Sequence, residues 1–161
     1  MTMNKTTRLN LRLALGLALA GCAGAVQATE IAMYRDPNCG CCLSWLKHAH
    51  EHFSADGDAV AAKTVESENI AAVKSANGVP ADLVSCHTAI VDGMVIEGHV
   101  PAADIERLLE ERPAGITGLA VAGMPLGSPG MEMGNRRQAY QVIAFGPDKR
   151  FVWSSYPASG N

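Results

Sequence analysis

The chain has 161 residues, enough for one domain with a modest core, and its 48% hydrophobic and 18% charged residues are typical of a folded protein. The first 28 positions hold three basic and no acidic residues, so the formal net charge of −3 becomes −6 for the remainder, with 10 basic and 16 acidic residues. This acidity argues against a nucleic-acid partner and leaves no polybasic surface for lipid.

The first 28 residues have the pattern of an export signal. A basic start, a short apolar run and small residues before a cleavage point follow one another: Lys5, Arg8 and Arg12, then Leu13 to Leu19, then Val26-Gln27-Ala28 before Thr29. A second interpretation is a lipobox at Leu19-Ala20-Gly21-Cys22, which would place a lipid on Cys22. We therefore expect a periplasmic protein with one domain at 29–161, attached to a membrane only if Cys22 is lipidated; no apolar run is long enough for a membrane span.

Strands and helices are predicted to alternate in the first half of this domain. A strand at 31–35 ends at the turn formers Asp36-Pro37-Asn38, and a helix at 41–53 has apolar residues on one face. A second strand at 59–65 and a second helix at 66–76 follow.

The second half begins with a predicted β-hairpin. Asp92-Gly93, the preferred pair for a two-residue turn, separates apolar runs at 88–91 and 94–96. Pro101 suits the first turn of a helix that runs to about Arg112. Residues 113–137 are rich in Gly, Pro and Met and hold no predicted element, and a terminal hairpin pairs 140–145 with 151–154.

A strand that leads a cysteine motif straight into a helix, with a hairpin later, is the layout of thioredoxin-like folds. The sequence therefore predicts an α/β, thioredoxin-like domain: a mixed sheet with flanking helices, a Gly/Pro/Met-rich loop and a C-terminal hairpin.

Four of the five cysteines belong to this domain, and Cys39, Cys41 and Cys42 lie within four residues. Neighbours this close cannot link distant parts of a chain, so the spacing indicates metal or redox chemistry. The start of a helix favours the thiolate, which is both the metal ligand and the nucleophile. With Cys86 alongside, these sulfurs would form a soft site for Cu(I), Zn²⁺ or an iron–sulfur cluster. The alternative is a Cys39–Cys42 disulfide with Cys41 and Cys86 as bystanders.

Several histidines and methionines are weaker ligand candidates. Cys86 and His87 are strand neighbours, so we expect them on opposite faces, with Cys86 the better ligand and His87 either a second ligand or a half-exposed strand residue. His48 and His52 are spaced for chelation, but a solvated polar helix face explains them better.

His99 lies between the hairpin and the next helix and has either a functional or a turn-forming role. Met124, Met131 and Met133 are soft candidate Cu(I) ligands in the Gly/Pro-rich stretch, although methionine more often only packs.

Several motifs occur in the order of one known family. They are Asp36-Pro37-x-Cys39-Gly40-Cys41-Cys42-x-x-Trp45, Ser85-Cys86-His87-Thr88-Ala89, Glu97-Gly98-His99-Val100-Pro101, Arg112-Pro113, Gly118-Leu119-Ala120-Val121 and Gly123-Met124-Pro125-x-Gly127-Ser128-Pro129-Gly130-Met131-Glu132. The chain resembles the bacterial metal-binding family of unknown function that includes the CopG-type periplasmic copper-resistance proteins. The resemblance implies a thioredoxin-like fold, a role in copper tolerance, and copper bound by Cys39, Cys41, Cys42 and Cys86 in a Cu(I)–thiolate cluster, with His87 adjacent.

The leading hypothesis is a periplasmic protein that holds Cu(I) for copper resistance, with periplasmic copper carriers or efflux components as partners. The first alternative is a thiol–disulfide oxidoreductase with Cys39 as nucleophile and Cys42 as resolving thiol. A zinc or iron–sulfur module is the second. The sequence leaves open whether the protein is an enzyme, either a copper or a thiol–disulfide oxidoreductase.

Overall fold

The computed structural model describes residues 28–55 and 57–160. The export signal, the lipobox and Cys22 lie outside the described residues. The elements, in chain order, are β1 (Thr29–Arg35), α1 (Gly40–Phe53), β2 (Val60–Glu66), α2 (Ile70–Ala76), the 3₁₀ helix η1 (Ala81–Leu83), β3 (His87–Val91), β4 (Met94–Glu97), α3 (Ala102–Glu111), β5 (Gly118–Ala120), β6 (Tyr140–Phe145) and β7 (Arg150–Tyr156).

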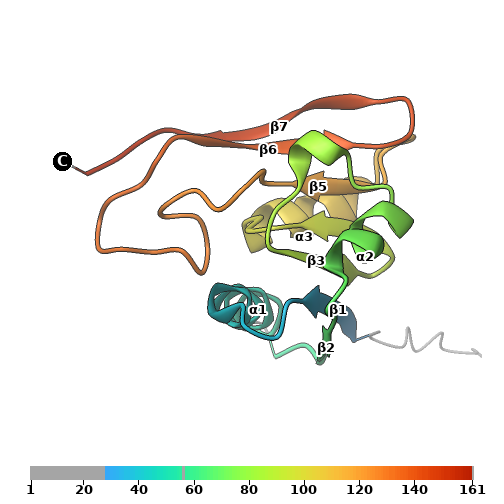
Figure 1. Ribbon diagram of the computed structural model, residues 1–161, viewed down its shortest axis with the longest axis horizontal. Helices are drawn as coiled ribbons and strands as arrows, with labels where there is room; N and C mark the ends of the chain where they lie inside the picture. Colours follow the sequence, from blue (N-terminus) through green and yellow to red (C-terminus); the bar gives the residue numbers. More distant parts are fainter. Residues whose placement is uncertain (1–27, 56, 161) are drawn as a thin grey trace, which may run out of the picture.

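The seven strands form one mixed sheet in the order β2-β1-β3-β4-β5-β6-β7 (Figure 1). The pairs β1–β2 and β4–β5 are parallel, and the other neighbours are antiparallel. The predictions of a mixed sheet, flanking helices and a terminal hairpin are therefore confirmed.

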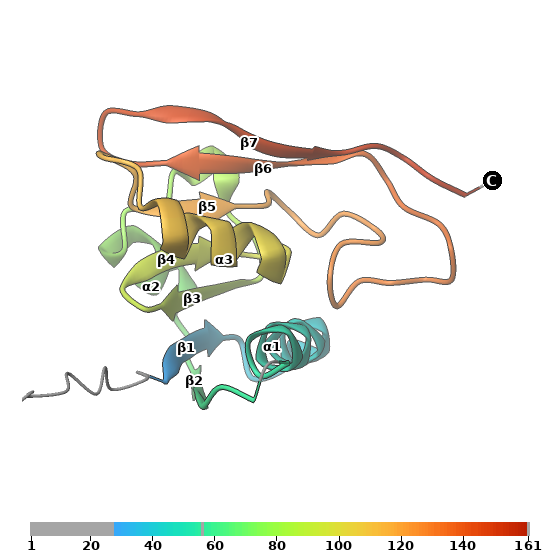
Figure 2. The same ribbon diagram turned by 180° about the vertical axis from the view of Figure 1, so that it is seen from behind.

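Helices cover both faces of the sheet. Helices α1 and α3 lie on one face, seen in front in Figure 2, and α2 lies on the other, in front in Figure 1. The face under α1 and α3 carries the larger apolar core, which includes Ile31, Met33, Trp45, Ile96 and Leu108. A smaller core lies on the α2 side and consists of Val79, Leu83, Val95, Ala120 and Phe145. No helix in the described part of the chain is long and apolar enough to cross a membrane.

The β3–β4 hairpin forms where the sequence predicts it. Asp92 and Gly93 both have positive φ, 44° and 83°, as a tight two-residue turn with the twist of the flanking strands requires. The turn sets the register, which pairs Val91 with Met94 and Thr88 with Glu97.

Two sequence predictions are wrong in detail. The second helix begins at Ile70 rather than at Glu66, because Glu66 still belongs to β2 and the side chain of Asn69 caps the helix by accepting a hydrogen bond from Ala72 N. Residues 113–137 do contain a strand, β5. It has only three residues, too few for an apolar pattern, and is made by its pairing with β4 and β6.

The segments that carry the candidate site residues lie at one end of the sheet. Here β1 ends at Arg35 opposite His87, where β3 begins, and β4 ends at Glu97 opposite Thr88. Helix α1 also begins at this end, five residues after Arg35.

Candidate metal and thiol site

The four cysteines of the domain meet at this end of the sheet. Cys39 is the N-cap of α1, Cys41 and Cys42 lie in its first turn, and Cys86 directly precedes β3. Their four Sγ atoms all lie within 4.8 Å of one another. The separations are 3.5 Å for Cys39–Cys41, 3.5 Å for Cys42–Cys86 and 3.9 Å for Cys41–Cys86.

Within this cluster, Cys39 and Cys42 are joined by a disulfide, and Cys41 and Cys86 are free thiols. This pairing is the alternative that the sequence analysis left open. The free thiols are not remote bystanders, however, because each lies 3.5 Å from one sulfur of the disulfide. The disulfide is therefore part of the same four-sulfur cluster.

A tight turn delivers the cysteines to the start of α1. Asn38 N donates to Asp36 Oδ1 at 2.8 Å, and Cys39 N donates to the Asp36 carbonyl at 3.0 Å. The buried Arg35 guanidinium donates to the carbonyls of Asp36 and Cys39 and pairs with Glu66 at 2.7 Å. Sequence reasoning missed Arg35, whose role depends on where the chain folds back.

The first turn of α1 supplies positive potential to the sulfurs. It contains no acidic residue, and its N-cap Cys39 makes no side-chain capping bond. No carboxylate in this turn therefore neutralises the backbone N–H groups at the helix start, beside the cysteine sulfurs.

Two buried histidines extend the cluster behind Cys86. His87 Nδ1 lies 3.3 Å and His99 Nε2 lies 3.1 Å from Cys86 Sγ, and the two imidazoles are fully buried. The expectation that Cys86 and His87 face opposite ways is wrong, because β3 begins only at His87 and strand alternation does not apply to Cys86. The alternative of a half-exposed His87 is also wrong, since His87 is buried against the Trp45 ring.

His99 is oriented by the segment between β5 and β6. Its Nδ1 lies 2.8 Å from the carbonyl oxygen of Pro129, which can only accept, so Nδ1 carries the hydrogen and Nε2 presents a lone pair toward Cys86. Burial lowers the pKa of His99 more than the hydrogen bond to Pro129 and the charge of Glu132 raise it, and this favours the neutral imidazole. Burial also lowers the pKa of His87, with further contributions from His99 and Lys74.

His99 was not placed among the site residues from the sequence, although a signal for it exists. The hairpin register pairs residue 91 with 94, and extending it past the strands sets Cys86 opposite His99.

Residues 123–134, which we call the strap, pass over the start of α1. Ser128 and Pro129 are buried, and Gly130 has a φ of 83° and packs directly on the helix backbone. A Cβ at Gly130 would lie 2.7 Å from Trp45 N and 2.9 Å from the Cys41 carbonyl. The three candidate methionines behave differently: Met124 and Met133 are 52% and 57% exposed, and Met131 is half-buried.

His48 and His52 face α3 rather than the cysteines. His48 Nε2 accepts a hydrogen bond from Ala102 N at 3.1 Å, and His52 Nε2 lies 3.0 Å from Glu106 Oε2. Each therefore binds a different partner along α3, in keeping with a polar helix face.

Cys86 differs chemically from an exposed thiol. Burial, followed by the neighbouring Cys41, raises the pKa of Cys86 to about 12. A thiol with this pKa is almost wholly protonated near neutral pH, so a metal that binds it must displace the proton.

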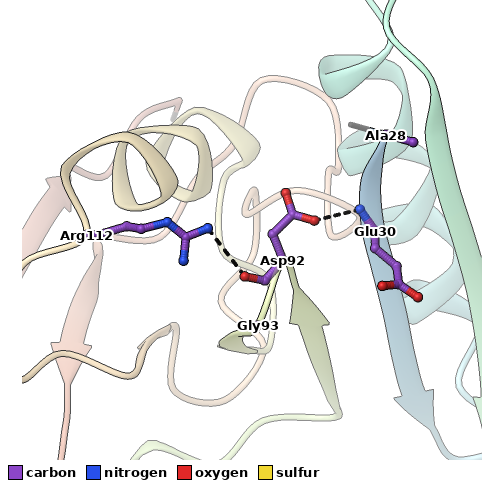
Figure 3. A pocket seen from close by; sticks show the side chains of 5 residues that line it. All are labelled: Ala28, Glu30, Asp92, Gly93 and Arg112. Carbon is purple, nitrogen blue, oxygen red and sulfur yellow. Dashed lines mark hydrogen bonds between the residues drawn. The ribbon is translucent and has the colours of Figure 1, made fainter. Parts of the chain in front are cut away.

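A separate polar hollow lies at the opposite end of the sheet (Figure 3). Asp92 accepts a hydrogen bond from Glu30 N at 2.8 Å on its side chain and one from Arg112 at 3.4 Å on its carbonyl. Ala28 and Gly93 complete the lining. The hollow contains no thiol or imidazole, and these contacts join the hairpin turn to the start of β1.

Comparisons with known proteins agree with the motifs of the site. Two solved structures described as copper resistance protein copG, in form 1 and form 2, are each 45% identical to this chain, with TM-scores of 0.72 and 0.71. Both cover 81% of this chain, and the matches span 99% and 100% of the respective structures. No curated protein matches this chain.

A family model described as a protein of unknown function, DUF411, matches residues 83–131. These residues include Cys86, both buried histidines and most of the strap. The chain belongs to this family of proteins of unknown function, which includes the CopG-type copper-resistance proteins.

Proposed function

We propose that this protein binds copper at Cys39, Cys41, Cys42 and Cys86 and serves in copper resistance. One observation carries the proposal: four Sγ atoms from two distant parts of the chain lie within 4.8 Å of one another. The copper-resistance name of the two similar structures supports the choice of metal.

The bound ion in this proposal is Cu(I), held after the Cys39–Cys42 disulfide is reduced. A dithiol would supply the two electrons and two protons that turn the disulfide into two thiols, and would itself become a disulfide. The reduced site would then offer four soft sulfurs, which favour Cu(I) over hard cations. A thiolate can bridge two copper ions, so a cluster this compact favours more than one Cu(I).

Zinc and an iron–sulfur cluster fit less well. Cys41 and Cys42 are helix neighbours, whose side chains diverge by about 100° around the axis, an awkward arrangement for one tetrahedral ion. The donor set also includes nitrogen close to Cys86, whereas most iron–sulfur clusters take cysteine alone.

His87 and His99 complete the donor set in this proposal. His99 presents Nε2 toward Cys86, and the buried Nε2 of His87 has no hydrogen-bond partner among the described residues. Borderline nitrogen donors beside soft sulfur can serve both Cu(I) and Cu(II). Such a set would permit the metal to change oxidation state.

A thiol–disulfide oxidoreductase remains the second candidate, and the Cys39–Cys42 disulfide at a helix start favours it. Cys39 would attack a substrate disulfide and Cys42 would resolve the mixed disulfide. The order β1-α1-β2-α2-β3-β4-α3, with β3 antiparallel to β1, supports a thioredoxin-like unit, to which β5–β7 are an addition.

For location, we propose export to the periplasm with 29–161 as the single domain, free or attached through a lipid on Cys22. The disulfide supports this, because disulfides persist in oxidising compartments. Periplasmic copper carriers or efflux components are the proposed partners. Cell fractionation with mass measurement of the mature N-terminus tests the location; full-length protein in the cytoplasm would contradict it.

The deciding experiment is an anaerobic titration of the reduced protein with Cu(I) against a chromophoric chelator. We expect more than one Cu(I) per chain and weaker retention in each of Cys39→Ser, Cys41→Ser, Cys42→Ser and Cys86→Ser. His52→Gln is the control, because His52 pairs with Glu106 on α3. Retention that does not depend on Cys41 or Cys86 would refute the cluster.

The same variants distinguish copper binding from the second candidate function, a thiol–disulfide oxidoreductase. An oxidoreductase that needs only Cys39 and Cys42 keeps its turnover of a disulfide substrate when Cys41 and Cys86 are both replaced by Ser. If that turnover persists and no variant alters Cu(I) retention, the oxidoreductase replaces copper binding as the function.

A further inference from the structure

A buried carboxylate lies directly behind the cysteine site. The side chain of Glu97, the last residue of β4, is fully buried. Its Oε1 accepts hydrogen bonds from Lys74 Nζ and from the backbone N–H of Ser85, both at 2.6 Å, and its Oε2 accepts one from Thr88 Oγ1 at 2.7 Å. The bond to Ser85 holds the residue immediately before Cys86.

Glu97 is the first of three consecutive residues that contact the segment around Cys86. Gly98 donates to the His87 carbonyl at 3.0 Å, and a Cβ at Gly98 would collide with the Ser85 side chain. His99 then places Nε2 3.1 Å from Cys86 Sγ. The end of one strand therefore sets the backbone before Cys86, the backbone after it and the surroundings of its sulfur.

Lys74 is the ion-pair partner of Glu97 in the protein interior, at 2.6 Å. It comes from α2, its side chain is 8% exposed, and it also donates to Thr88 at 3.2 Å. Taking two charges out of water offsets much of their attraction, so a buried ion pair is weak evidence for stability. The hydrogen bond that Glu97 accepts from Ser85 N points in a fixed direction, and it gives the ion pair a role beyond stability.

We infer that Glu97 is a positioning residue for the copper site: its carboxylate, neutralised by Lys74, fixes Ser85 N–H and thereby holds Cys86 Sγ 3.5 Å from Cys42 and 3.1 Å from His99. The inference rests on the proposed function for its consequence in copper binding. Its structural part, the fixed position of Cys86, does not depend on copper.

The test compares Glu97→Gln and Glu97→Asp with the matched control Asp104→Asn. Asp104 is also a nearly buried carboxylate with three side-chain partners, Arg107, Ser154 and Tyr156, but it joins α3 to β7 and contacts no residue of the cysteine site. Glu97→Gln removes the charge, and Glu97→Asp keeps the charge but shortens its reach toward Ser85 N. Glu97→Asp also serves if Glu97→Gln does not fold.

Two readouts are taken beside thermal unfolding. In the metal-free protein we expect the alkylation rate of Cys86, relative to Cys41 and followed by mass spectrometry, to rise several-fold in both Glu97 variants. In the reduced protein we expect Cu(I) retention to weaken about 10- to 100-fold, the usual cost of removing a group that orients a metal ligand. Asp104→Asn should lower the unfolding temperature and leave both readouts unchanged.

The outcomes are separable. Equal Cys86-to-Cys41 alkylation ratios in the wild type and both Glu97 variants, or the same increase in Asp104→Asn, would overturn the positioning role. If the wild type retains no Cu(I) while the alkylation ratio rises only in the Glu97 variants, the proposed copper function fails and the positioning of Cys86 stands.

Discussion

Cys86 combines close sulfur and nitrogen neighbours with low acidity. Its Sγ lies 3.5 Å from Cys42 and 3.1 Å from His99, yet burial raises its pKa to about 12. The thiol is therefore better suited to bind a metal that displaces its proton than to attack a disulfide near neutral pH.

The pH dependence of Cys86 alkylation checks this assignment. Because only the thiolate reacts, the rate should rise about tenfold per pH unit throughout the range below a pKa of about 12, without levelling off near the ordinary thiol value of about 8.5. The folded state holds this proton more tightly than the unfolded state, so the same shift lowers stability as pH rises above that ordinary value. A rate that levels off near pH 9, measured by iodoacetamide labelling and mass spectrometry, would contradict the shift.

His99 should affect copper without affecting the disulfide. His99→Asn keeps an amide N–H near the position of Nδ1, within reach of the Pro129 carbonyl, but removes the Nε2 lone pair beside Cys86. We expect about tenfold weaker Cu(I) retention, corresponding to about 1.4 kcal/mol, measured by chelator competition. Formation of the Cys39–Cys42 disulfide, followed by thiol counting, should be unchanged. Equal weakening in the control His52→Gln would show an effect unrelated to the site.

At the scale of elements, the strap is attached to α1 by close backbone packing. The approach at Gly130 requires both a positive φ and the absence of a side chain. This packing places the Pro129 carbonyl against His99, so the strap orients a site residue although its own exposed Met124 and Met133 point to solvent.

Gly130→Ala should therefore be costly. We expect a loss of more than about 1–2 kcal/mol, the cost of a left-handed residue alone, because the new Cβ also meets Trp45 N and the Cys41 carbonyl. Gly134→Ala is the matched control, with a φ of 63° and no atom within 4 Å of the new Cβ. Urea unfolding of both variants measures the difference; equal losses would mean that the strap packs loosely on α1.

The elements differed in how well the sequence predicts them. Asp92-Gly93 determines the hairpin because a tight turn needs positive φ at both positions. Strand β5 could not be predicted, since three residues carry no period and its pairing depends on distant strands. Cys39, Cys41 and Cys42 could be assigned from their spacing and Cys86 from the family resemblance, and the hairpin register could have added His99. Glu97 and Lys74 could not, because their pairing exists only once α2 lies on the sheet.

At the scale of the whole molecule, the disulfide contributes little to holding the fold together. It closes a loop with a sequence separation of only three. In the chain-entropy account, closing a loop this short adds only about 2 kcal/mol to the free energy of unfolding. Most of the stabilisation therefore comes from the two apolar cores, which lie on the two faces of the sheet. We therefore expect the domain to stay folded when the Cys39–Cys42 disulfide is reduced.

Reduction should lower the unfolding temperature only modestly. A loss of about 2 kcal/mol corresponds to a decrease of about 6–10 °C for a domain of this size. Calorimetry with and without a reductant measures it, with Cys39→Ser as the variant that cannot form the bond. Complete unfolding on reduction would mean that the disulfide is structural, and a reduced copper site could not exist.

The direction of β1 also determines how the domain would be oriented if it were attached to a membrane through the segment before Thr29. The strand begins at Thr29 beside the hairpin turn and runs seven residues, about 20 Å, toward the turn that carries Cys39. Any attachment through the preceding segment would hold the far end of the sheet toward the bilayer and turn the thiols outward. A tethered form would then expose the cysteine site to molecules in solution without having to detach.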